Sequence, residues 1–166
     1  SSWVKGTWET ISMLRNTNIS LAHVGGGNIE DINRLKEHAK SCKVEVWFAP
    51  RLTQNELTIL LKNARASISL AHGEPFGLTP IEAFAVGTPA IYVEEGGFTD
   101  TIIDKENGRL IARGDIENWH LALKDAENID NRIRWSKAGI ERIKSLDLSC
   151  EKHAERIYNI YKEFKN

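Results

Sequence analysis

The sequence predicts an α/β fold with a doubly wound, Rossmann-like parallel sheet and helices on both faces. Short apolar segments alternate with segments of helical periodicity along nearly the whole chain. The apolar segments expected to form strands are residues 19–24, 44–49, 66–71, 90–93 and 110–112. Strands separated by helices form βαβ units, and right-handed crossovers then produce a parallel sheet that is covered on both faces.

Capping signals mark the starts of several helices between these strands. Thr7 is expected to cap the first helix and Asn28 the second. Residues 53–56, Thr-Gln-Asn-Glu, fit a capping box that precedes leucines at helical spacing. Asp115 is expected to cap a later helix, and the last part of the chain predicts two helices with a break near Asp147.

The composition describes one ordinary globular domain over residues 1–166. Apolar residues make up 41% and charged residues 27%, and the formal net charge is -1, so we expect no surface for nucleic acid or an anionic membrane. No apolar run approaches the roughly 20 residues that a membrane-spanning helix needs. Cys42 and Cys150 are isolated and lack metal or redox spacing, which suits a reducing compartment.

Segment 70–91 carries most of the functional information. It places two carboxylates, Glu74 and Glu82, on either side of a Phe-Gly-Leu turn at 76–78 that opens a helix. Unpaired backbone N–H groups and the helix dipole favour an anion at such a turn. Carboxylates there would repel phosphate and are better explained as partners of hydroxyls on a ribose or a sugar. Phosphate at the amides and hydroxyls at the carboxylates together indicate a nucleotide-sugar.

A structural role competes with this interpretation at Glu82. Thr79, Pro80 and Glu82 fit a capping box with proline at the first helical position, so local physics explains Glu82 at least as well without a ligand. Glu74 has no such capping role between its strand and the helix. A functional role is therefore favoured for Glu74.

Two glycine turns follow strands at the same expected edge of the sheet. The glycines at 25–27 invite a dinucleotide interpretation, but the G-x-G-x-x-G fingerprint needs glycine where this chain has Glu30. A tight strand-to-helix turn is favoured instead, although its glycines could still let the backbone at Gly25 pass close to a ligand. The turn at Gly97 is a second candidate cradle for an anion or a hydroxyl, equally well explained as a plain turn.

His72 and Lys5 are expected near this edge as well. His72 ends a strand and could contact phosphate or sugar, although a structural histidine explains it equally well. Lys5 precedes the first helix and could place an ammonium near the site, or be solvated surface. No D-x-D pair is present, so the sequence gives no indication of a metal-bound diphosphate.

The E-x7-E pattern from Glu74 to Glu82, with FGL inside it and EAFAVGTPAI and EEGGFTDTI following, closely resembles the retaining glycosyltransferases of group 1 (family 4). The chain resembles their carboxyl-terminal, nucleotide-sugar-binding half over essentially its whole length. KG at 5–6, GGG at 25–27 and LTQNEL at 52–57 are weaker matches. The flanks LTPIEAF and EGGF are most similar to mannosyltransferase-like members.

The resemblance implies a role for each matching residue. Glu82 would hold the ribose hydroxyls of the donor, Glu74 would contact the donor sugar, and Lys5 would neutralise the diphosphate. The backbone amides that would face the sugar and the diphosphate are those of Phe76, Gly77 and Leu78. The chain departs from the family pattern in two places. The Arg that usually precedes the lysine, and the strand that carries it, have no counterpart, and Asp100 stands where Glu is usual.

Family members have two Rossmann-like domains in the GT-B arrangement, and the acceptor-binding amino-terminal domain is absent from this sequence. The resemblance therefore implies that residues 1–166 form one donor-binding domain, which needs the acceptor domain in cis or in trans and is inactive alone. The implied reaction moves a hexose, with mannose the nearest match, from a nucleoside diphosphate sugar to a saccharide or lipid-linked acceptor with retention, as in polysaccharide biosynthesis.

No cofactor other than the donor substrate is expected, and no metal. Three alternatives stay open, and the third is a pure interaction domain, which only the five tryptophans favour. The first is a non-catalytic nucleotide-sugar-binding module, which the missing Arg favours and the intact Glu74 and Glu82 disfavour. The second is a dinucleotide-binding oxidoreductase domain, which Glu30 disfavours. The expected location is the cytoplasm, with peripheral attachment to the inner face of the membrane through the absent half as the alternative.

Overall fold

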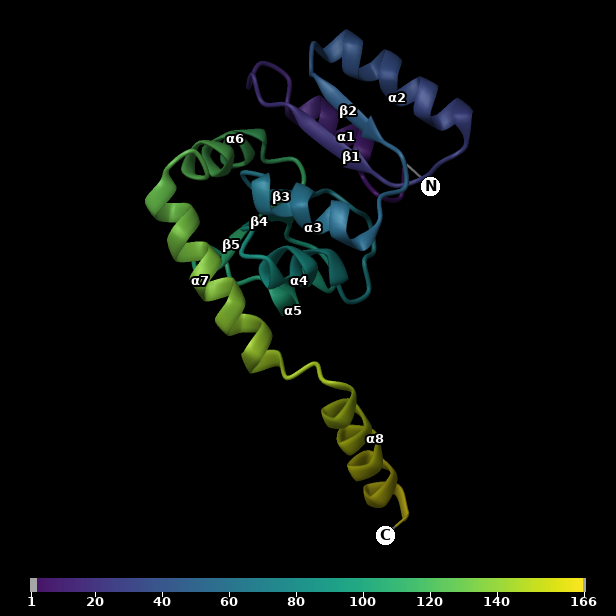
Figure 1. Ribbon diagram of the computed structural model, residues 1–166, viewed down its shortest axis with the longest axis vertical. Coiled ribbons are helices and arrows are strands. Elements are labelled where there is room, and N and C mark those ends of the chain that lie inside the picture. The colour runs from purple at the N-terminus through teal and green to yellow at the C-terminus, as the bar shows by residue number, and fades with distance from the viewer. Residues whose placement is uncertain (1–2, 166) are drawn as a thin grey trace.

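The computed structural model describes residues 3–165 and confirms the predicted α/β class (Figure 1). Its strands are β1 (Leu21–Val24), β2 (Val46–Ala49), β3 (Ser67–Ser69), β4 (Ala90–Val93) and β5 (Gly108–Ile111). Every pair of neighbouring strands is parallel. Parallel neighbours need a crossover connection, and a helix lies in each one here.

The helices agree with the predicted alternation. They are α1 (Thr7–Met13), α2 (Ile29–Cys42), α3 (Gln54–Asn63), α4 (Leu78–Ala85), α5 (Phe98–Thr101), α6 (Ile116–Asp125), α7 (Ile129–Leu146) and α8 (Cys150–Lys165). The predicted caps at Asn28, Thr53 and Asp115 are confirmed, because each side chain accepts a hydrogen bond from a backbone N–H in the first turn of its helix.

The prediction that Thr7 caps α1 is wrong. Thr7 is the first helical residue, and Gly6 takes the capping position with a left-handed φ of 66°. A Cβ on Gly6 would lie 2.0 Å from the carbonyl oxygen of Leu70, so only glycine fits this close approach to the end of β3.

The strands form two parallel sheets in the part of the chain that the structure describes. In the first, β1 pairs with β2, with Leu21 opposite Val46. In the second, the order is β3-β4-β5, with Ser67 opposite Ala90 and Ala90 opposite Gly108. The sequence predicts one sheet, whereas a cavity separates the facing edges of β1 and β3.

The hydrophobic core is densest around the second sheet. All four residues of β4 are buried. Trp119 on α6 and Trp135 on α7 are also fully buried, and each donates its indole N–H to a backbone carbonyl at 3.1 Å. α7 packs on α4 at Gly139, where a Cβ would lie 2.6 Å from the ring of Phe84. This packing fixes α4, the helix that carries Glu82.

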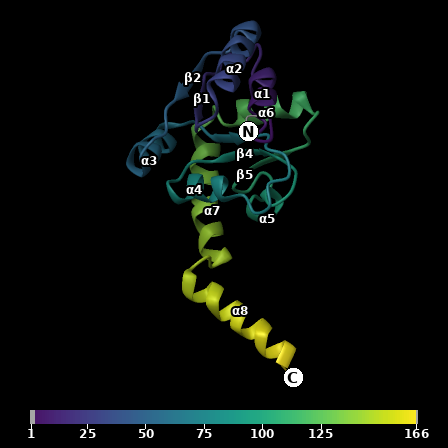
Figure 2. The ribbon, with the colours of Figure 1, turned by 90° about the vertical axis from the view of Figure 1, so that its right-hand side faces the viewer.

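The last helix extends away from the rest of the molecule (Figures 1 and 2). The predicted break near Asp147 is confirmed, since this residue ends α7 in the left-handed region with a φ of 46°. The apolar side chains of α8 remain exposed, namely Ile157, Tyr158, Ile160, Tyr161 and Phe164.

Candidate functional site

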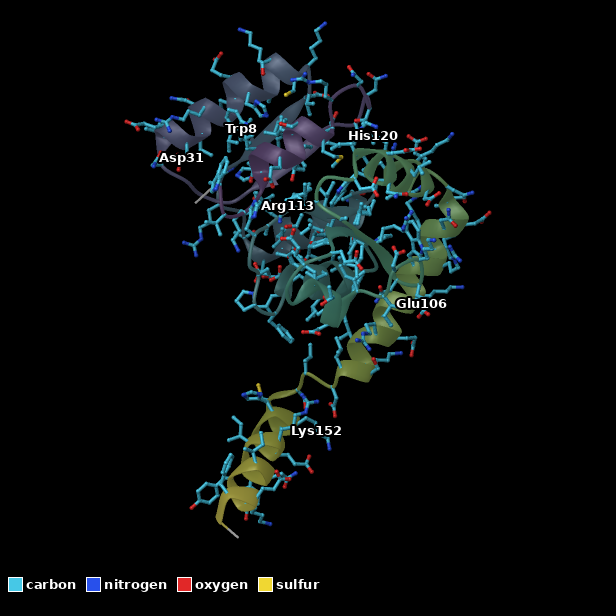
Figure 3. The ribbon with its side chains drawn as sticks, turned by 180° about the vertical axis from the view of Figure 1, so that it is seen from behind. Trp8, Asp31, Glu106, Arg113, His120 and Lys152 are labelled. Atoms are coloured by element: carbon cyan, nitrogen blue, oxygen red, sulfur yellow. The ribbon has the colours of Figure 1, made fainter. Side chains whose placement is uncertain are left out.

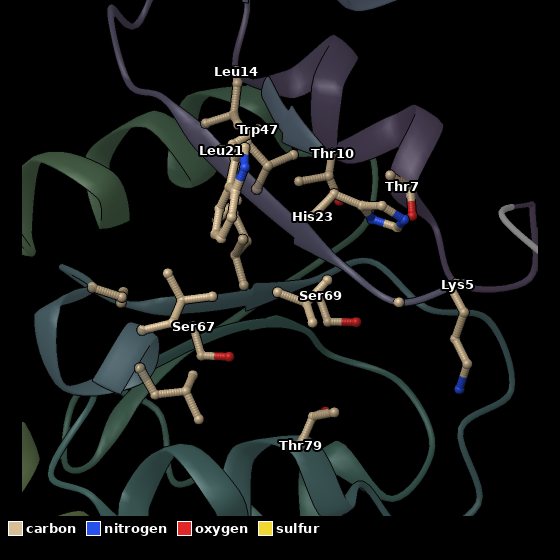
Figure 4. A pocket seen from close by; sticks show the side chains of 18 of the residues that line it. Lys5, Thr7, Thr10, Leu14, Leu21, His23, Trp47, Ser67, Ser69 and Thr79 are labelled. Atoms are coloured by element: carbon tan, nitrogen blue, oxygen red, sulfur yellow. The ribbon is translucent and has the colours of Figure 1, made fainter. Parts of the chain in front are cut away.

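A cavity of about 1040 Å³ opens where β1, β3 and the start of α1 meet (Figure 4). Lys5 lines it from the segment before α1, and Gly25 from the turn after β1. Glu74 lines it from the turn after β3, and Glu82 from α4. Four of the predicted site residues, from four separate segments, therefore share one cavity. Ligands of parallel sheets bind at this carboxyl edge of the strands.

The carboxylate of Glu74 is held at the mouth of the cavity by a single cation. Its Oε2 accepts a hydrogen bond from Lys5 Nζ at 3.1 Å. The Lys5 side chain is 65% exposed and that of Glu74 only 22% exposed. The backbone carbonyl of Glu74 is fixed separately, because it accepts a hydrogen bond from the Gly97 N–H at 2.8 Å.

Glu82 has an exposed carboxylate with no hydrogen bond or ion pair among the described residues. The capping-box alternative is wrong, because α4 begins at Leu78 and its cap is Gly77, with no side-chain capping bond. The hydroxyl of Tyr92, which is buried beside α4, lies 2.7 Å from Ser67 Oγ. The Glu82 carboxylate is thus available to accept hydrogen bonds inside the cavity.

The turn at 76–78 packs tightly on the turn after β4. A Cβ on Gly77, whose φ is 81°, would lie 2.8 Å from the ring of Phe98, and a Cβ on Gly97 would lie 2.4 Å from the Cα of Phe76. Neither turn tolerates a side chain at these glycines. Because the Gly97 N–H already donates to Glu74, the observed role of Gly97 is to support the first turn.

Several predicted site residues do not line the cavity. Phe76 and Leu78 have side chains that are 41% and 61% exposed. The others outside the lining are Gly77, Gly97 and His72. The ligand contacts predicted for these five residues stay predictions, whereas the packing of Gly77 and Gly97 is established.

His72 belongs to a polar cluster centred on Arg113, which the sequence analysis missed. Arg113 Nη1 donates to a Glu9 carboxylate oxygen and lies 3.2 Å from His72 Nε2, while Nη2 donates to Glu95 Oε2 at 2.6 Å. His72 Nε2 also lies 3.1 Å from Glu9 Oε2. Figure 3 shows Arg113 next to α1, and its side chain is 23% exposed.

The Arg113 guanidinium joins the ends of three strands to α1. It also donates to the backbone carbonyls of Leu70 and Ala71, at 2.8 and 3.3 Å. The hydrogen bond from Arg113 holds the pKa of Glu95 below its usual value, and the same bond raises that of Arg113. The available sequence signal was position alone, since Arg113 follows β5 at the same edge as Glu74.

A model of the family described as glycosyl transferases group 1 matches residues 4–142. The chain belongs to the group 1 glycosyltransferase family. Among curated relatives of this glycosyltransferase domain is the alpha-1,3/1,6-mannosyltransferase alg-2 of Neurospora crassa. It is 31% identical over 104 residues, which are 61% of this chain and 22% of the relative. The match therefore covers less than a quarter of the length of that relative.

Solved structures support the same fold for the glycosyltransferase domain. Sucrose-phosphate synthase from Thermosynechococcus elongatus superimposes with a TM-score of 0.85 at 24% identity, covering 98% of this chain and 43% of that one. The Anabaena protein HepE, solved in complex with UDP-glucose, superimposes with a TM-score of 0.78 at 17% identity, covering 98% and 46%. The Rossmann-like fold is thus that of one half of a GT-B glycosyltransferase.

Between residues 3 and 165, no helix combines the length and the apolar character needed to cross a membrane.

Proposed function

We propose that this domain binds a nucleoside diphosphate sugar and, with an acceptor-binding domain, transfers its hexose with retention of configuration. The observation that carries the proposal is the cavity that Lys5, Glu74 and Glu82 share. Family membership adds support. HepE, a neighbour in fold, was solved with UDP-glucose, and the mannosyltransferase relative favours mannose as the hexose.

The proposed roles follow the charges in the cavity. Glu82, which lacks a protein partner among the described residues, accepts hydrogen bonds from the ribose hydroxyls. Glu74 accepts hydrogen bonds from the sugar. Lys5 and the backbone N–H groups at the start of α4 stabilise the negative charge that develops on the leaving diphosphate. This electrostatic stabilisation is strongest in the transition state, where the bond between the anomeric carbon and the diphosphate oxygen is breaking.

Retention is proposed to proceed by attack on the same face of the sugar through a short-lived oxocarbenium-like state. Glu74 contacts hydroxyls in this scheme and does not form a covalent glycosyl-enzyme. The attacking hydroxyl belongs to the acceptor molecule, which the second domain is proposed to hold, because residues 1–166 are proposed to form the donor-binding domain.

Glu82→Gln tests the proposal. A carboxylate that receives two ribose hydroxyls forms charge-assisted hydrogen bonds, so its loss should weaken nucleotide binding by roughly tenfold or more while the melting temperature stays near that of the parent. Calorimetry with UDP, GDP, UDP-glucose and GDP-mannose measures the first quantity, and a melting curve the second.

Glu106→Gln is the matched control, because Glu106 is an exposed glutamate outside the cavity. A Glu82→Gln variant that binds every nucleotide as the parent does would refute the assignment of the ribose contact. A parent chain that binds none of these nucleotides would refute the donor site itself.

A further inference from the structure

Arg113 is not among the residues that line the cavity, and its guanidinium has no donor left for a ligand. Its Nε and Nη2 donate to the two carboxylate oxygens of Glu95, at 2.9 and 2.6 Å, and Nη1 donates to Glu9 on α1. The remaining N–H groups donate to the backbone carbonyls of Leu70 and Ala71, at the end of β3. Because an arginine has five N–H donors and all are taken up by the protein, a role for Arg113 in the donor site has to be indirect.

The backbone stretch 70–72, which accepts two of the hydrogen bonds from Arg113, also holds the segment that carries Lys5. The last residue of the stretch donates its N–H to the Val4 carbonyl at 2.8 Å. Gly6 lies against the first carbonyl of the stretch, where a Cβ would come within 2.0 Å of the oxygen. Lys5 stands between these two contacts. Its backbone is therefore fixed against the same residues that the Arg113 guanidinium fixes.

Glu74 is held from another side, through the turn after β4. The Gly97 N–H donates to the Glu74 carbonyl at 2.8 Å, and a Cβ on Gly96 would lie 2.5 Å from the same carbonyl oxygen. Glu95 comes directly before these two glycines and receives two hydrogen bonds from Arg113. The guanidinium therefore fixes both the stretch that leads into the Glu74 turn and the turn that supports it.

The charges of this cluster add to the effect of its hydrogen bonds. The carboxylates of Glu9, on α1, and Glu95, on the turn after β4, share the single positive charge of Arg113. The three side chains are between 23% and 39% exposed, so water screens their charges only in part. Without the cation, the two carboxylates would repel each other. The repulsion would act between α1, which directly follows the Lys5 segment, and the turn that supports Glu74.

We propose that Arg113 is a positioning residue of the donor site, which sets the distance between the Lys5 ammonium and the Glu74 carboxylate. These groups, 3.1 Å apart, are then aligned so that one meets the diphosphate and the other the sugar. The pair cannot align itself, because the Lys5 side chain is 65% exposed and such pairs contribute little. The inference rests on the proposed function, since it concerns how donor-binding groups are held.

Glu82 provides the internal contrast. It lines the same cavity, but it lies on α4. Among the described residues, no hydrogen bond or ion pair joins Arg113 to α4, because the bonds of its guanidinium reach α1, the end of β3 and the turn after β4. Removal of Arg113 should therefore disturb what Lys5 and Glu74 do for a donor and leave the contribution of Glu82 intact.

A double-mutant cycle of donor binding tests the inference. Arg113→Gln should weaken binding of GDP-mannose, or of UDP-glucose if the parent prefers it, by about fivefold or more. In a Glu74→Gln background the same substitution should weaken binding by less than about twofold, because the group that it positions is already disabled. In a Glu82→Gln background it should keep its full effect. A purely structural role would give equal effects in the two backgrounds, and that result would overturn the proposal.

Arg109→Gln is the matched control for a general loss of stability. Arg109 on β5 also donates to two carboxylates, those of Asp104 at 2.9 Å and Asp125 at 2.7 Å, but it does not line the cavity. Its variant should melt earlier and bind the donor as the parent does. Arg113→Lys should recover part of the affinity, because it keeps the charge without the planar fork. Affinities are measured at a temperature where melting curves show every variant to be folded. Equal weakening of donor binding by Arg109→Gln and Arg113→Gln would contradict the positioning role.

Hydrogen exchange in the ligand-free chain tests the positioning without any donor. The Gly97 and His72 amides make the hydrogen bonds that hold the two aligned segments. Arg113→Gln should speed their exchange by about tenfold or more relative to the amides of β4, and Arg109→Gln should not. Unchanged exchange at both amides would overturn the inference on its own. A parent chain that binds no nucleotide would instead refute the proposed function, and the exchange rates would still show whether Arg113 aligns the two segments.

Discussion

Lys5 and Glu74 illustrate how single residues prepare the proposed donor site. Their ion pair is largely exposed on the lysine side, and exposed pairs contribute at most about 1 kcal/mol. A diphosphate can therefore attract Lys5 at little cost. The backbone of Glu74 does not depend on this pair, because its carbonyl is held by the Gly97 N–H. The Glu74 carboxylate can therefore reorient toward a sugar while the backbone of the loop after β3 stays in place.

Arg113 is expected to contribute more to stability than any exposed ion pair of the chain. Arg113→Met would leave the carboxylates of Glu9 and Glu95 without their shared cation and two carbonyls without a donor. We expect a loss of roughly 1–3 kcal/mol in the free energy of unfolding, measured by urea denaturation. Arg113→Lys should recover only part of it, because an ammonium lacks the planar fork.

Arg65→Gln provides the comparison for this prediction. Arg65 pairs with Glu127, and both side chains are about half exposed, so we expect a loss below about 1 kcal/mol. Equal losses for the Arg113 and Arg65 variants would show that the Arg113 cluster does not stabilise the fold beyond an ordinary surface pair.

Glu95 should make the stability of the fold depend on pH in the acid range. The pKa of Glu95 is lowered in the folded chain from the ordinary value of 4.5, chiefly by the hydrogen bond from Arg113. The folded state therefore binds this proton less readily than the unfolded state. The stabilisation is fully present above about pH 4.5 and is lost as the pH falls through the folded pKa.

The urea midpoint measured at a series of pH values checks this expectation. Glu95→Gln should flatten the decline in the acid range without abolishing it, because the helix caps also lower the pKa values of Glu56 and Asp115. A variant that declines as steeply as the parent would exclude Glu95 as a source of the pH dependence.

At the scale of helices and strands, local rules predicted the elements well and failed where tertiary contacts set the backbone. The caps at Asn28 and Thr53 satisfy N–H groups within their own helices, so the sequence alone identifies them. The capping positions before Thr7 and Leu78 are taken by Gly6 and Gly77 instead. Each glycine is needed because another segment of the chain approaches it closely. Such a tertiary approach cannot be predicted from the local sequence.

The candidate site likewise contains residues that the sequence could place together and residues that it could not. Lys5, Gly25, Glu74 and Glu82 could be placed together in advance, because the carboxyl ends of parallel strands share one edge. The Arg113 cluster could not be predicted from the sequence, since Arg113 and Glu9 are 104 residues apart and no short sequence pattern joins them. The separation of β1 from β3 was also beyond prediction, because apolar periodicity identifies strands and not their partners.

Gly77 should be the least replaceable glycine of the turn that opens α4. Gly77→Ala would combine a φ of 81° with a Cβ 2.8 Å from the Phe98 ring. Gly73→Ala would have the unfavourable φ of 58° with nothing within 4 Å, and Gly114→Ala would have neither problem. We expect the free energy of unfolding to fall by roughly 2 kcal/mol or more for Gly77→Ala and by about 1 kcal/mol for Gly73→Ala. For Gly114→Ala we expect almost no change.

Urea denaturation of the three glycine variants separates the two causes. The difference between the Gly73 and Gly114 variants measures backbone strain, and the further loss in the Gly77 variant measures the clash with Phe98. A Gly77→Ala protein as stable as the Gly114→Ala protein would mean that the two turns do not pack as the structure shows.

At the scale of the whole molecule, the domain covers only part of the proteins it resembles, 22% of the mannosyltransferase relative and 43% of the sucrose-phosphate synthase chain. The cavity supplies candidate groups for the nucleotide, the diphosphate and the sugar. The proposed reaction also needs a hydroxyl held against the anomeric carbon, and we assign that task to the acceptor-binding domain. Positioning of two reactants can account for roughly 7–11 kcal/mol of a barrier, so donor binding alone gives no efficient transfer.

We therefore expect the chain alone to bind a donor sugar without turning it over. Release of UDP or GDP from UDP-glucose or GDP-mannose, followed in a coupled assay, should stay at the level of the buffer, while the protein expressed from its complete natural gene shows transfer. If the chain alone transferred sugar to an acceptor, the division of labour between the two domains would be wrong. If the complete protein bound the donor equally well and transferred nothing, the domain would be a binding module that keeps the Glu74 and Glu82 site for recognition.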